Sequence, residues 1–534
     1  KKNPIFNILI PMIADDPSII APIVQHLKKS FKTKKTLSIQ YRKEQLRNLL
    51  RGLKELEPKF HDALEKDLGV NETMSRMLST NVAMDEVEVC LKGIDKWIKP
   101  ETTDVPLLVG PGKSYITPEP YGVGLVIGAW NYPVTTSVPY VASAIAAGNC
   151  CVIKPSELSA HSSKVIAELF EKYLDKDCYR CIEGQVEVAK AIIKQPFDVI
   201  VFTGSTEKGK LVAKAASENL IPYVLELGGK SPTIVDSNAD LDNAAFRIMQ
   251  GRFMNAGQTC VACDYLFVHK DIKAKLLEKF KAKLKEFYGE DPAKSTDYSK
   301  IINDFHVKRL KGYLDENHGG KVIVGGQVNP KDRYVAPTLI DNPKITSKLM
   351  QDEIFGPILP IYEFSDIDYV INFINEREKP LALYYYGSTS SQNWKRLKLE
   401  TSSGGLVANE SVVQFGVLEA PFGGVGASGQ GKLHGISGFR AFSHNKSVFE
   451  KGGINFYPFN VRYPPHKGLR LKTLNFMLNL STVNQGTINQ VIILILLLVL
   501  FFVLFRRGHF DVIIQTAGNV VKEITKSDGK RSDL

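Results

Sequence analysis

The spacing of apolar residues changes along the chain. Between about residues 22 and 70, leucines recur at positions i, i+3, i+4 and i+7 among Lys, Arg and Glu, which is the pattern of a helix with one buried face. These leucines are Leu46, Leu49, Leu50 and Leu53. This part of the chain is therefore predicted to be helical.

From Gly122 onward the apolar residues gather into short runs. The runs at 123–129, 150–154 and 198–204 each lead towards a helix-like segment rich in Ala, Ser, Glu and Lys. Such alternation predicts a parallel sheet covered by helices, with ligands bound at the carboxyl ends of the strands. A second alternating series covers residues 230 to about 415, so two α/β domains are expected.

One apolar run, at residues 491–505, is unlike the others. It reads VIILILLLVLFFVLF and stops at Arg506 and Arg507. Extended back to Gly486, it would form a helix of about 30 Å, the thickness of the hydrocarbon core of a bilayer. A buried core helix is the alternative, but such helices usually keep a polar face and this run has none. Residues 486–505 are predicted to be a membrane anchor, either spanning the bilayer or lying in its interface as a hairpin.

The charge of the chain is concentrated near the same end. The 534 residues carry a net charge of +11, yet no basic stripe interleaved with aromatic residues is present, so nucleic acid is not predicted as a partner. Instead, no Asp or Glu occurs between Glu450 and Asp511. The basic residues of this region are Lys451, Arg462, Lys467, Arg470, Lys472, Arg506 and Arg507.

The seven cysteines are sparse, odd in number and unevenly spaced, which is unlike a disulfide scaffold. A reducing, cytosol-facing environment is therefore predicted. Cys178 and Cys181 have C-x-x-C spacing, but no second pair or histidine cluster completes a ligand set, so no metal is predicted.

A candidate phosphate site lies in FTGSTEKG, residues 202–209. An apolar strand runs into Gly204, and a helix is predicted to begin near Thr206. Backbone N–H groups at the start of a helix suit a phosphate. The motif is neither G-x-G-x-x-G nor a P-loop, and a tight turn without a ligand explains it equally well.

Two further residues are candidates for a catalytic role. Gly257 is predicted to allow a close approach of the backbone. Cys260 follows it among small and polar residues, where a thiol would be accessible, although most cysteines are structural. Glu226 stands between two leucines on a predicted strand that ends at Gly228 and Gly229. Burial would raise the pKa of this carboxyl towards that of a general base. A Glu held by the N–H groups of a turn is the structural alternative.

Together these segments resemble the aldehyde dehydrogenase superfamily over roughly residues 22–465, in motif order and in spacing. The matching motifs are GAWNYP (128–133), KPSE (154–157), FTGSTEKG, LELGGKSP (225–232), NAGQTC (255–260), EIFGP (353–357) and APFGGVGASGQG (420–431). WNYP, FSHNKSVF (442–449) and RYPP (462–465) resemble the class 3 branch. A hydrophobic tail after this point is typical of the fatty aldehyde dehydrogenases in that branch.

The resemblance implies a role for each catalytic residue. Cys260 would attack the aldehyde, and the side chain of Asn131 with the backbone N–H of Cys260 would hold the oxyanion. Glu226 would activate the water that hydrolyses the resulting thioester.

The resemblance also implies a cofactor site for NAD, with NADP possible. Lys154 and Glu157 would lie at the adenine ribose, where Glu157 would repel a 2′-phosphate and Lys154 would partly offset that repulsion. The other residues assigned to the cofactor are Gly204, Ser205 and Gly209 of the phosphate motif, and Glu353 and Phe355 at the nicotinamide ribose.

The fold implied is an α/β aldehyde dehydrogenase fold with a Rossmann-like NAD-binding domain, an α/β catalytic domain and a β-arm for oligomerisation, followed by the hydrophobic anchor. A homodimer is expected. The expected segments are an N-terminal segment (1–21), the NAD-binding domain (22–226), the catalytic domain (227–417), the arm (98–120 with 418–447), a basic juxtamembrane segment (448–485), the anchor (486–505) and a polar tail (506–534).

The anchor argues for long-chain aldehydes derived from membrane lipid. The membrane of the endoplasmic reticulum, the mitochondrial outer membrane and the lipid droplet all remain compatible. A CoA-acylating enzyme, a preference for medium-chain or aromatic aldehydes, and a catalytically silent membrane scaffold are the alternatives.

Position 263 departs from the family pattern, because Cys replaces the Pro of many relatives. A neutral small residue is one interpretation. A reversible disulfide between Cys260 and Cys263 is the other.

Overall fold

The computed structural model describes residues 16–106, 108–453 and 455–479. These residues fall into two compact units. The larger unit contains the described residues up to Ile98 together with Pro118–His444, and the smaller contains Lys99–Thr117 and the described residues from Asn445 onward.

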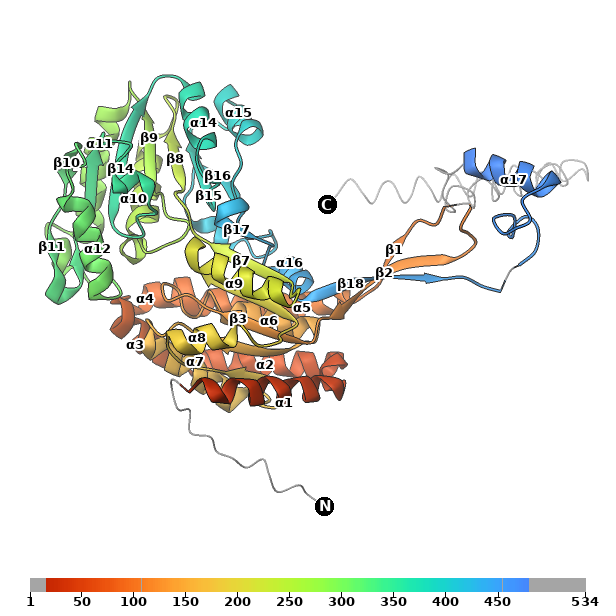
Figure 1. Ribbon diagram of the computed structural model, residues 1–534. Helices are drawn as coiled ribbons and strands as arrows, with labels where there is room; N and C mark the ends of the chain where they lie inside the picture. Colours follow the sequence, from red (N-terminus) through yellow and green to blue (C-terminus); the bar gives the residue numbers. More distant parts are fainter. Residues whose placement is uncertain (1–15, 107, 454, 480–534) are drawn as a thin grey trace, which may run out of the picture. The chain divides into compact units, whose positions relative to one another are not determined.

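The larger unit contains a six-stranded sheet in the order β17-β7-β6-β3-β4-β5 (Figure 1). Its strands are β3 (Val123–Ile127), β4 (Cys150–Lys154), β5 (Tyr179–Cys181), β6 (Val199–Gly204), β7 (Tyr223–Leu227) and β17 (Gly429–Gln430). All neighbours are parallel except β17, which runs antiparallel to β7. The predicted parallel sheet is confirmed, with its strands within one or two residues of the apolar runs.

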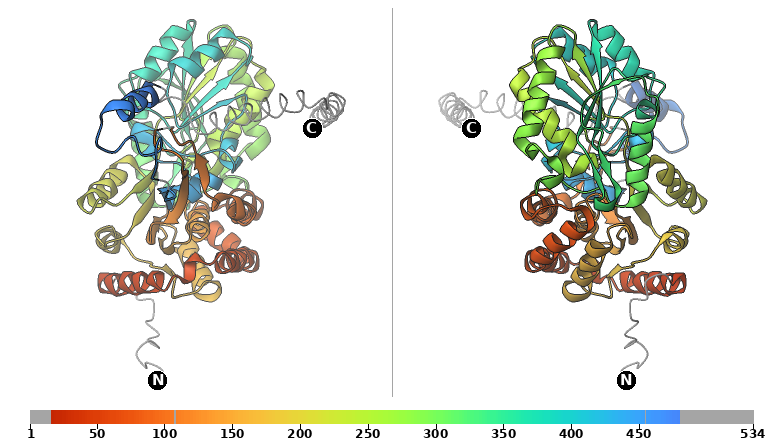
Figure 2. Two further views of the ribbon diagram at one scale, coloured as in Figure 1. Left: turned by 90° about the vertical axis from the view of Figure 1, so that its right-hand side faces the viewer. Right: turned by 90° about the vertical axis from the view of Figure 1, so that its left-hand side faces the viewer.

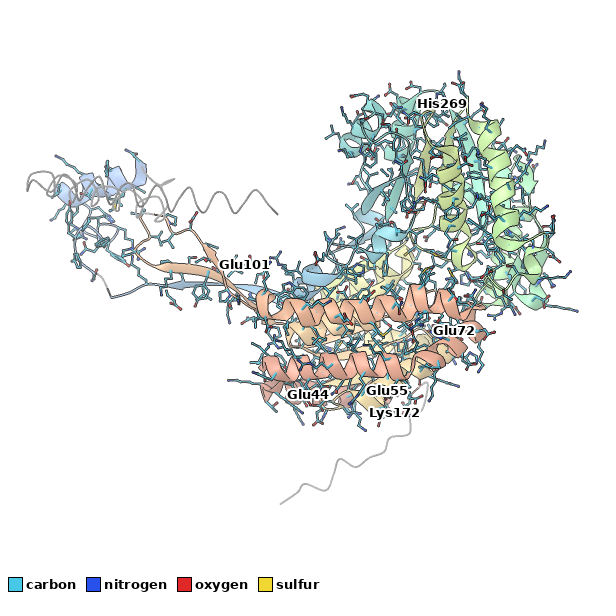
Figure 3. All side chains as sticks on the ribbon, turned by 180° about the vertical axis from the view of Figure 1, so that it is seen from behind. Glu44, Glu55, Glu72, Glu101, Lys172 and His269 are labelled. Carbon is cyan, nitrogen blue, oxygen red and sulfur yellow. The ribbon has the colours of Figure 1, made fainter. Side chains whose placement is uncertain are left out.

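Helices cover this sheet. Leu46, Leu49 and Leu53 are fully buried, as their spacing predicts. The predicted helical region is divided, because Ser38 caps one helix by accepting a hydrogen bond from Tyr41 N and Pro58 stands in the first turn of the next. Figure 3 shows α2, which carries the labelled Glu44 and Glu55, beside α5. These helices are α1 (Ile20–Lys32), α2 (Ile39–Glu55), α3 (Glu57–Leu68), α4 (Glu72–Ser75), α5 (Asn81–Trp97), α6 (Val138–Ala147), α7 (Ala160–Tyr173), α8 (Val186–Ile192) and α9 (Thr206–Glu218).

A second sheet follows in the same unit, with seven strands in the order β10-β13-β14-β9-β8-β15-β16. In Figure 2 the green and cyan strands of this sheet lie between helices. In this sheet only β10 is antiparallel to its neighbour. The strands of the sheet are β8 (Pro232–Val235), β9 (Tyr265–His269), β10 (Lys321–Val324), β13 (Thr338–Asp341), β14 (Ile358–Phe364), β15 (Ala382–Tyr386) and β16 (Gly405–Ala408). A separate two-stranded sheet pairs β11 (Val328–Asn329) with β12 (Tyr334–Val335).

Both faces of the second sheet bury apolar side chains. One face packs with Leu276, Phe280 and Leu310 of the helices on its side, and the other packs with Val370 and Phe373. The helices of the first face are α10 (Leu241–Phe253), α11 (Lys273–Tyr288) and α12 (Asp304–Asp315), and those of the other are α14 (Ile367–Asn375) and α15 (Gln392–Glu400), while α13 (Lys348–Gln351) is a single turn before β14. The alternation of strands and helices expected after residue 230 is therefore present, and its sheet lies in the same compact unit as the first.

The predicted arm segment 418–447 needs correction. Leu433, Phe439 and Phe442 are almost fully buried in the core of the first sheet, and α16 (Gly435–Ala441) packs on α5 and α6. These apolar side chains need a core, which a strand excursion does not supply. The two strands of the segment belong to different sheets: β17 pairs with β7 in the first sheet, and only the last residues of the segment enter β18 (Ser443–Glu450).

The smaller unit is built on a three-stranded sheet in the order β1-β2-β18. It is formed by β1 (Glu101–Thr103), β2 (Lys113–Pro120) and β18, so the predicted excursion at 98–120 does form strands. Within this unit the hydroxyl of Tyr115 donates to Glu450 at 2.6 Å.

Helix α17 (Gly468–Asn479) also belongs to the smaller unit and was not predicted. Its apolar residues surround the helix instead of forming one stripe, so periodicity gives no signal for it. Arg470 ties it to the preceding loop by donating to the carbonyl oxygen of Asn460 at 2.7 Å. The predicted basic segment 448–485 thus contains the end of a strand and a helix.

Within the described part of the chain, no helix has both the length and the apolar character needed to cross a membrane. The predicted anchor at 486–505 and the polar tail at 506–534 lie outside the described residues, as do residues 1–15 of the N-terminal segment.

Candidate active site

The site lies where strands of the two sheets meet. Glu226 is near the carboxyl end of β7, and the chain then passes through Gly228 and Gly229 into β8. Cys260 lies in the loop before β9, and Glu353 lies in the loop before β14. Because β9 and β14 are neighbours, these two loops lie side by side, and both carboxylates act electrostatically on Cys260.

The loop that carries Cys260 is tightly bent. Asn255, Ala256 and Gly257 all have positive φ angles, of 51°, 51° and 73°. A Cβ atom on Gly257 would lie 2.3 Å from the carbonyl oxygen of Gly356, so only glycine lets this loop pass against the EIFGP loop. The close approach predicted for Gly257 is therefore confirmed.

Cys260 is half-buried. Burial raises the pKa of its thiol, and Glu353 and Glu226 raise it further, while the backbone N–H groups of Cys260 and Val261 lower it. These N–H groups favour a negative sulfur but do not outweigh burial. A positive charge next to the thiol would promote its ionisation.

Asn131 is buried in the loop after β3 and is tied to the cysteine loop. Its side-chain amide donates to the carbonyl oxygen of Gln258 at 3.0 Å, and its own carbonyl accepts from Asn255 Nδ2 at 2.9 Å. The hydroxyl groups of Tyr132 and Thr259 lie 2.7 Å apart. The GAWNYP and NAGQTC loops therefore form one hydrogen-bonded assembly around the thiol.

Glu226 is only 3% exposed, and its Oε1 atom has no hydrogen-bond partner. Burial raises the pKa of this carboxyl to about 8, with an opposing contribution from Lys432. The structural alternative, a carboxylate satisfied by the N–H groups of a turn, does not fit an unpartnered oxygen. A carboxyl group with this pKa can exchange protons near neutral pH.

Glu353 lies against the two glycines that follow Glu226. A Cβ atom on Gly228 would be 2.2 Å from Glu353 Oε2, and the backbone N–H of Gly229 donates to the carboxylate. Burial raises the pKa of Glu353 to about 8, and Asp264 raises it as well. The LELGG and EIFGP motifs thus meet at one carboxylate.

Sequence reasoning missed the charged residues beneath the EIFGP loop. Arg252 is fully buried and donates to Asp264 at 3.1 Å, and Lys230 donates to the same carboxylate at 2.6 Å. Asp264 in turn accepts from the backbone N–H of Ile354 at 3.2 Å. The available signal was an arginine among the apolar residues of α10.

Arg309 on α12 holds the same loop from another side. It donates to the carbonyl oxygens of Ile354 at 2.7 Å and Phe355 at 3.1 Å. Phe355 has a φ of 44°, and its ring meets Trp130 edge-on at 5.2 Å. Arg309 therefore helps to hold a backbone conformation that a non-glycine residue rarely adopts.

The predicted cofactor residues occupy strand ends of the first sheet. Lys154 ends β4 and Gly204 ends β6. Strand order reverses between β3 and β6, which is where open parallel sheets bind nucleotides. Ser205 caps α9 by accepting from Lys208 N, and the first N–H groups of the helix are free of intrahelical partners. These residues fit a dinucleotide.

The contacts of Lys154 and Gly209 refine the predicted cofactor site. Lys154 is buried and donates to Glu157 at 3.0 Å, so the negative charge of Glu157 is partly neutralised. A Cβ atom on Gly209 would lie 2.6 Å from Leu227, so this glycine lets α9 pack against β7. Gly209 thus has a packing role.

Cys263, the proposed disulfide partner of Cys260, lies in the protein core. Cys263 is fully buried, with its sulfur 3.2 Å from Ser411 Oγ, as a small core residue would be. Its disulfide with Cys260 stays a hypothesis. Among residues 16–479, leaving out 107 and 454, no group of His, Cys, Asp and Glu is arranged to hold a metal ion.

The thiol of Cys260 lies near an amide and two buried carboxylates, in the same unit as a parallel sheet whose strand order reverses between β3 and β6. Residues 12–448 match the model of the aldehyde dehydrogenase family. The chain belongs to the aldehyde dehydrogenase family.

Individual relatives narrow the assignment. The chain is 42% identical to the "Aldehyde dehydrogenase, dimeric NADP-preferring" of Rattus norvegicus, over 84% of this chain and 98% of the relative. It is 40% identical to "Aldehyde dehydrogenase family 3 member A2" of the same species, over 89% of this chain and 97% of the relative. The class 3 assignment is therefore confirmed.

A solved structure agrees. The substrate-bound state of Staphylococcus aureus AldH is 39% identical, with a TM-score of 0.82, and the match covers 86% of this chain and 99% of that one. The protein is an NAD(P)-dependent aldehyde dehydrogenase, as predicted.

Proposed function

We propose that this enzyme oxidises long-chain aliphatic aldehydes to carboxylic acids with NAD, through a thioester on Cys260. The observation that carries the proposal is the grouping of this thiol with Asn131 and Glu226. The family relationship supports aldehyde oxidation, and the chain length is the new part.

In the first half-reaction Cys260 loses its thiol proton to water, and the resulting thiolate sulfur forms a bond to the aldehyde carbon. The carbonyl oxygen becomes an oxyanion, which the side-chain amide of Asn131 and the backbone N–H of Cys260 hold by hydrogen bonds. NAD, when bound, would supply the hydride acceptor, and the carbon attached to sulfur would lose a hydride and become the carbonyl carbon of a thioester.

In the second half-reaction the carboxylate of Glu226 takes a proton from water. The water oxygen bonds to the acyl carbon, the carbon–sulfur bond breaks, and Cys260 departs as thiolate. The free acid is released. A base with a pKa of about 8 can do this near neutral pH, which also argues against a requirement for CoA.

We assign the cofactor contacts as follows. Lys154 and Glu157 would meet the adenine ribose, and Ser205 with Gly204 would meet the pyrophosphate at the start of α9. Glu353 would accept hydrogen bonds from the nicotinamide ribose, with Phe355 packed nearby. Because Lys154 pairs with Glu157 at 3.0 Å, we expect only a modest preference for NAD over NADP.

The preference for an aliphatic chain is argued from the apolar run at residues 486–505, which would hold the enzyme against a supply of aldehydes derived from lipid. The residues around Asn131 are also apolar, but the pocket that they leave has room for little more than a water molecule. They are Leu64, Leu68, Val70, Met74 and Leu78. A long chain would have to displace these side chains, and each methylene buried among them would contribute about 0.8 kcal/mol.

A series of aldehydes from C2 to C18, assayed with NAD and NADP in detergent, tests this directly. We expect kcat/KM to rise steeply with chain length, without any need for CoA. A flat series or a preference for short or aromatic aldehydes would remove the long-chain proposal. Failure to reduce either cofactor with any aldehyde would revive the silent scaffold.

The location is a separate proposal. We infer that residues 486–505 anchor the enzyme to the endoplasmic reticulum, the mitochondrial outer membrane or a lipid droplet, with the catalytic unit facing the cytosol. The apolar run and the basic residues before it support this. A homodimer, as in the relative named dimeric, would be built through the strands of the smaller unit.

Flotation with liposomes tests the anchor. The full chain and a variant lacking only 506–534 should float, whereas a variant lacking 486–534 should stay in the soluble fraction with its activity on short aldehydes intact. Equal flotation of all three proteins would exclude this run as the anchor.

A further inference from the structure

A lysine outside the predicted catalytic set lies close to the proposed base. Lys432 follows β17, which pairs antiparallel with β7 so that Gly429 stands opposite Glu226. The chain then turns back toward Gly423. Lys432 is half-buried, and its ammonium group donates to the carbonyl oxygens of Gly423 and Gly424.

Gly423 lies between this lysine and the carboxylate. A Cβ atom on Gly423 would lie 2.7 Å from Glu226 Oε1 and 3.1 Å from Lys432 Cδ. Glu226 and the lysine side chain therefore flank the same point of the backbone. The Glu226 oxygen on this side is the one without a hydrogen-bond partner.

The other titratable groups around Glu226 do not supply a positive charge. Tyr140 on α6 and Cys260 interact with it electrostatically, and burial raises the pKa of each, so both are neutral near pH 7. Lys432 lowers the pKa of Glu226, whereas burial lowers the pKa of Lys432 and Glu226 partly offsets that effect. An ammonium group has three N–H donors, and two are used by the glycine carbonyls.

We propose that Lys432 is a positioning residue for thioester hydrolysis, whose ammonium group stabilises the ionised carboxylate of Glu226 and keeps the base available at neutral pH. The proposal rests on Glu226 being the base. Because Gly423 has no side chain, no Cβ atom stands between the Glu226 carboxylate and the Lys432 side chain at this point.

The test measures loss of the protein-bound acyl group after a single turnover with octanal and NAD, from pH 6 to 10. Lys432→Met removes the charge and keeps most of the stem, and should raise the apparent pKa of hydrolysis by about one unit. Hydrolysis should be roughly tenfold slower at pH 7 and should recover above pH 9.5. Lys432→Arg should restore the parent profile.

Lys379→Met is the matched control, because this exposed lysine lies near Gly426 of the same segment and does not act on Glu226. An unchanged pH profile in Lys432→Met, or an equal loss of rate at every pH, would overturn the proposal and leave only a structural tie to the glycine carbonyls. Normal turnover in Glu226→Gln would instead overturn the assignment of the base.

Discussion

The side-chain amide of Asn131 donates a 3.0 Å hydrogen bond to the carbonyl oxygen of Gln258, two residues before Cys260. The amide that is proposed to hold the oxyanion is therefore fastened to the loop that carries the nucleophile. A substrate oxygen would replace this carbonyl as the acceptor, so little rearrangement of the protein is needed.

Replacing Asn131 by Ala should lower kcat by about 10²- to 10³-fold, the usual cost of losing one oxyanion donor. Steady-state NADH formation measures it. Asn149→Ala is a suitable control, since this buried amide donates to Phe442 O, away from the thiol. Asn149→Ala should lower Tm while the folded protein keeps its turnover. Similar kcat losses in both variants would mean that Asn131 acts only through stability.

Cys260→Ala should form no NADH, and Glu226→Gln should form one equivalent per site and then stall with the acyl group attached. Rapid mixing and mass measurement of the stalled protein distinguish these outcomes. Glu86→Gln provides the control, because Glu86 is also a buried carboxyl, with its pKa raised to about 7, but it accepts from the backbone N–H of Gly435. It should turn over continuously. Continuous turnover in Glu226→Gln would refute the assigned base.

The raised pKa of Glu226 also predicts how stability depends on pH. The folded carboxyl has a pKa of about 8 against an ordinary 4.5, so its ionisation costs folding free energy. This cost is absent below about pH 4.5, grows between 4.5 and 8, and is complete above 8. Glu226→Gln should therefore raise Tm by about 2–4 °C at pH 9 and leave it unchanged at pH 4.5.

Calorimetry at the two pH values is the measurement. The exposed Glu44 on α2, labelled in Figure 3, provides the control substitution Glu44→Gln, which should alter Tm equally little at both. A Tm gain for Glu226→Gln that is the same at pH 4.5 and pH 9 would contradict the raised pKa.

Arg309 should affect cofactor binding more than chemistry. Two N–H groups of its guanidinium donate to the carbonyl oxygens of Ile354 and Phe355. A lysine ammonium group would not reproduce the planar geometry of these two hydrogen bonds. In Arg309→Lys we expect KM for NAD to rise about tenfold and kcat to fall less. Arg377→Lys is the comparison, because Arg377 donates to the carbonyl of Phe373 within α14, and it should change neither constant. A pure loss of kcat would place Arg309 in another role.

Much of the architecture followed from local sequence. The leucines of α2 and the apolar runs of β3, β4 and β6 were located because helices and strands repeat their buried positions at different periods. Gly257 was predicted to allow a close approach of the backbone, and the structure shows that the neighbouring backbone is that of Gly356. Helix α17 was not predicted because its apolar residues form no stripe. The bounds 418–447 for the arm came from the resemblance, which does not show that Leu433, Phe439 and Phe442 are buried in the core.

The sequence by itself determined most of the helices and strands of the first sheet and singled out Cys260 and Glu226 as candidate nucleophile and base, since these depend on residue type and on neighbours along the chain. Only the tertiary structure decided that Gly228 makes room for Glu353, that Asp264 joins Arg252 to Lys230, and that Lys432 flanks Glu226. Such contacts depend on which strands lie side by side and on how loops from two sheets meet. Periodicity within one segment carries no information about them.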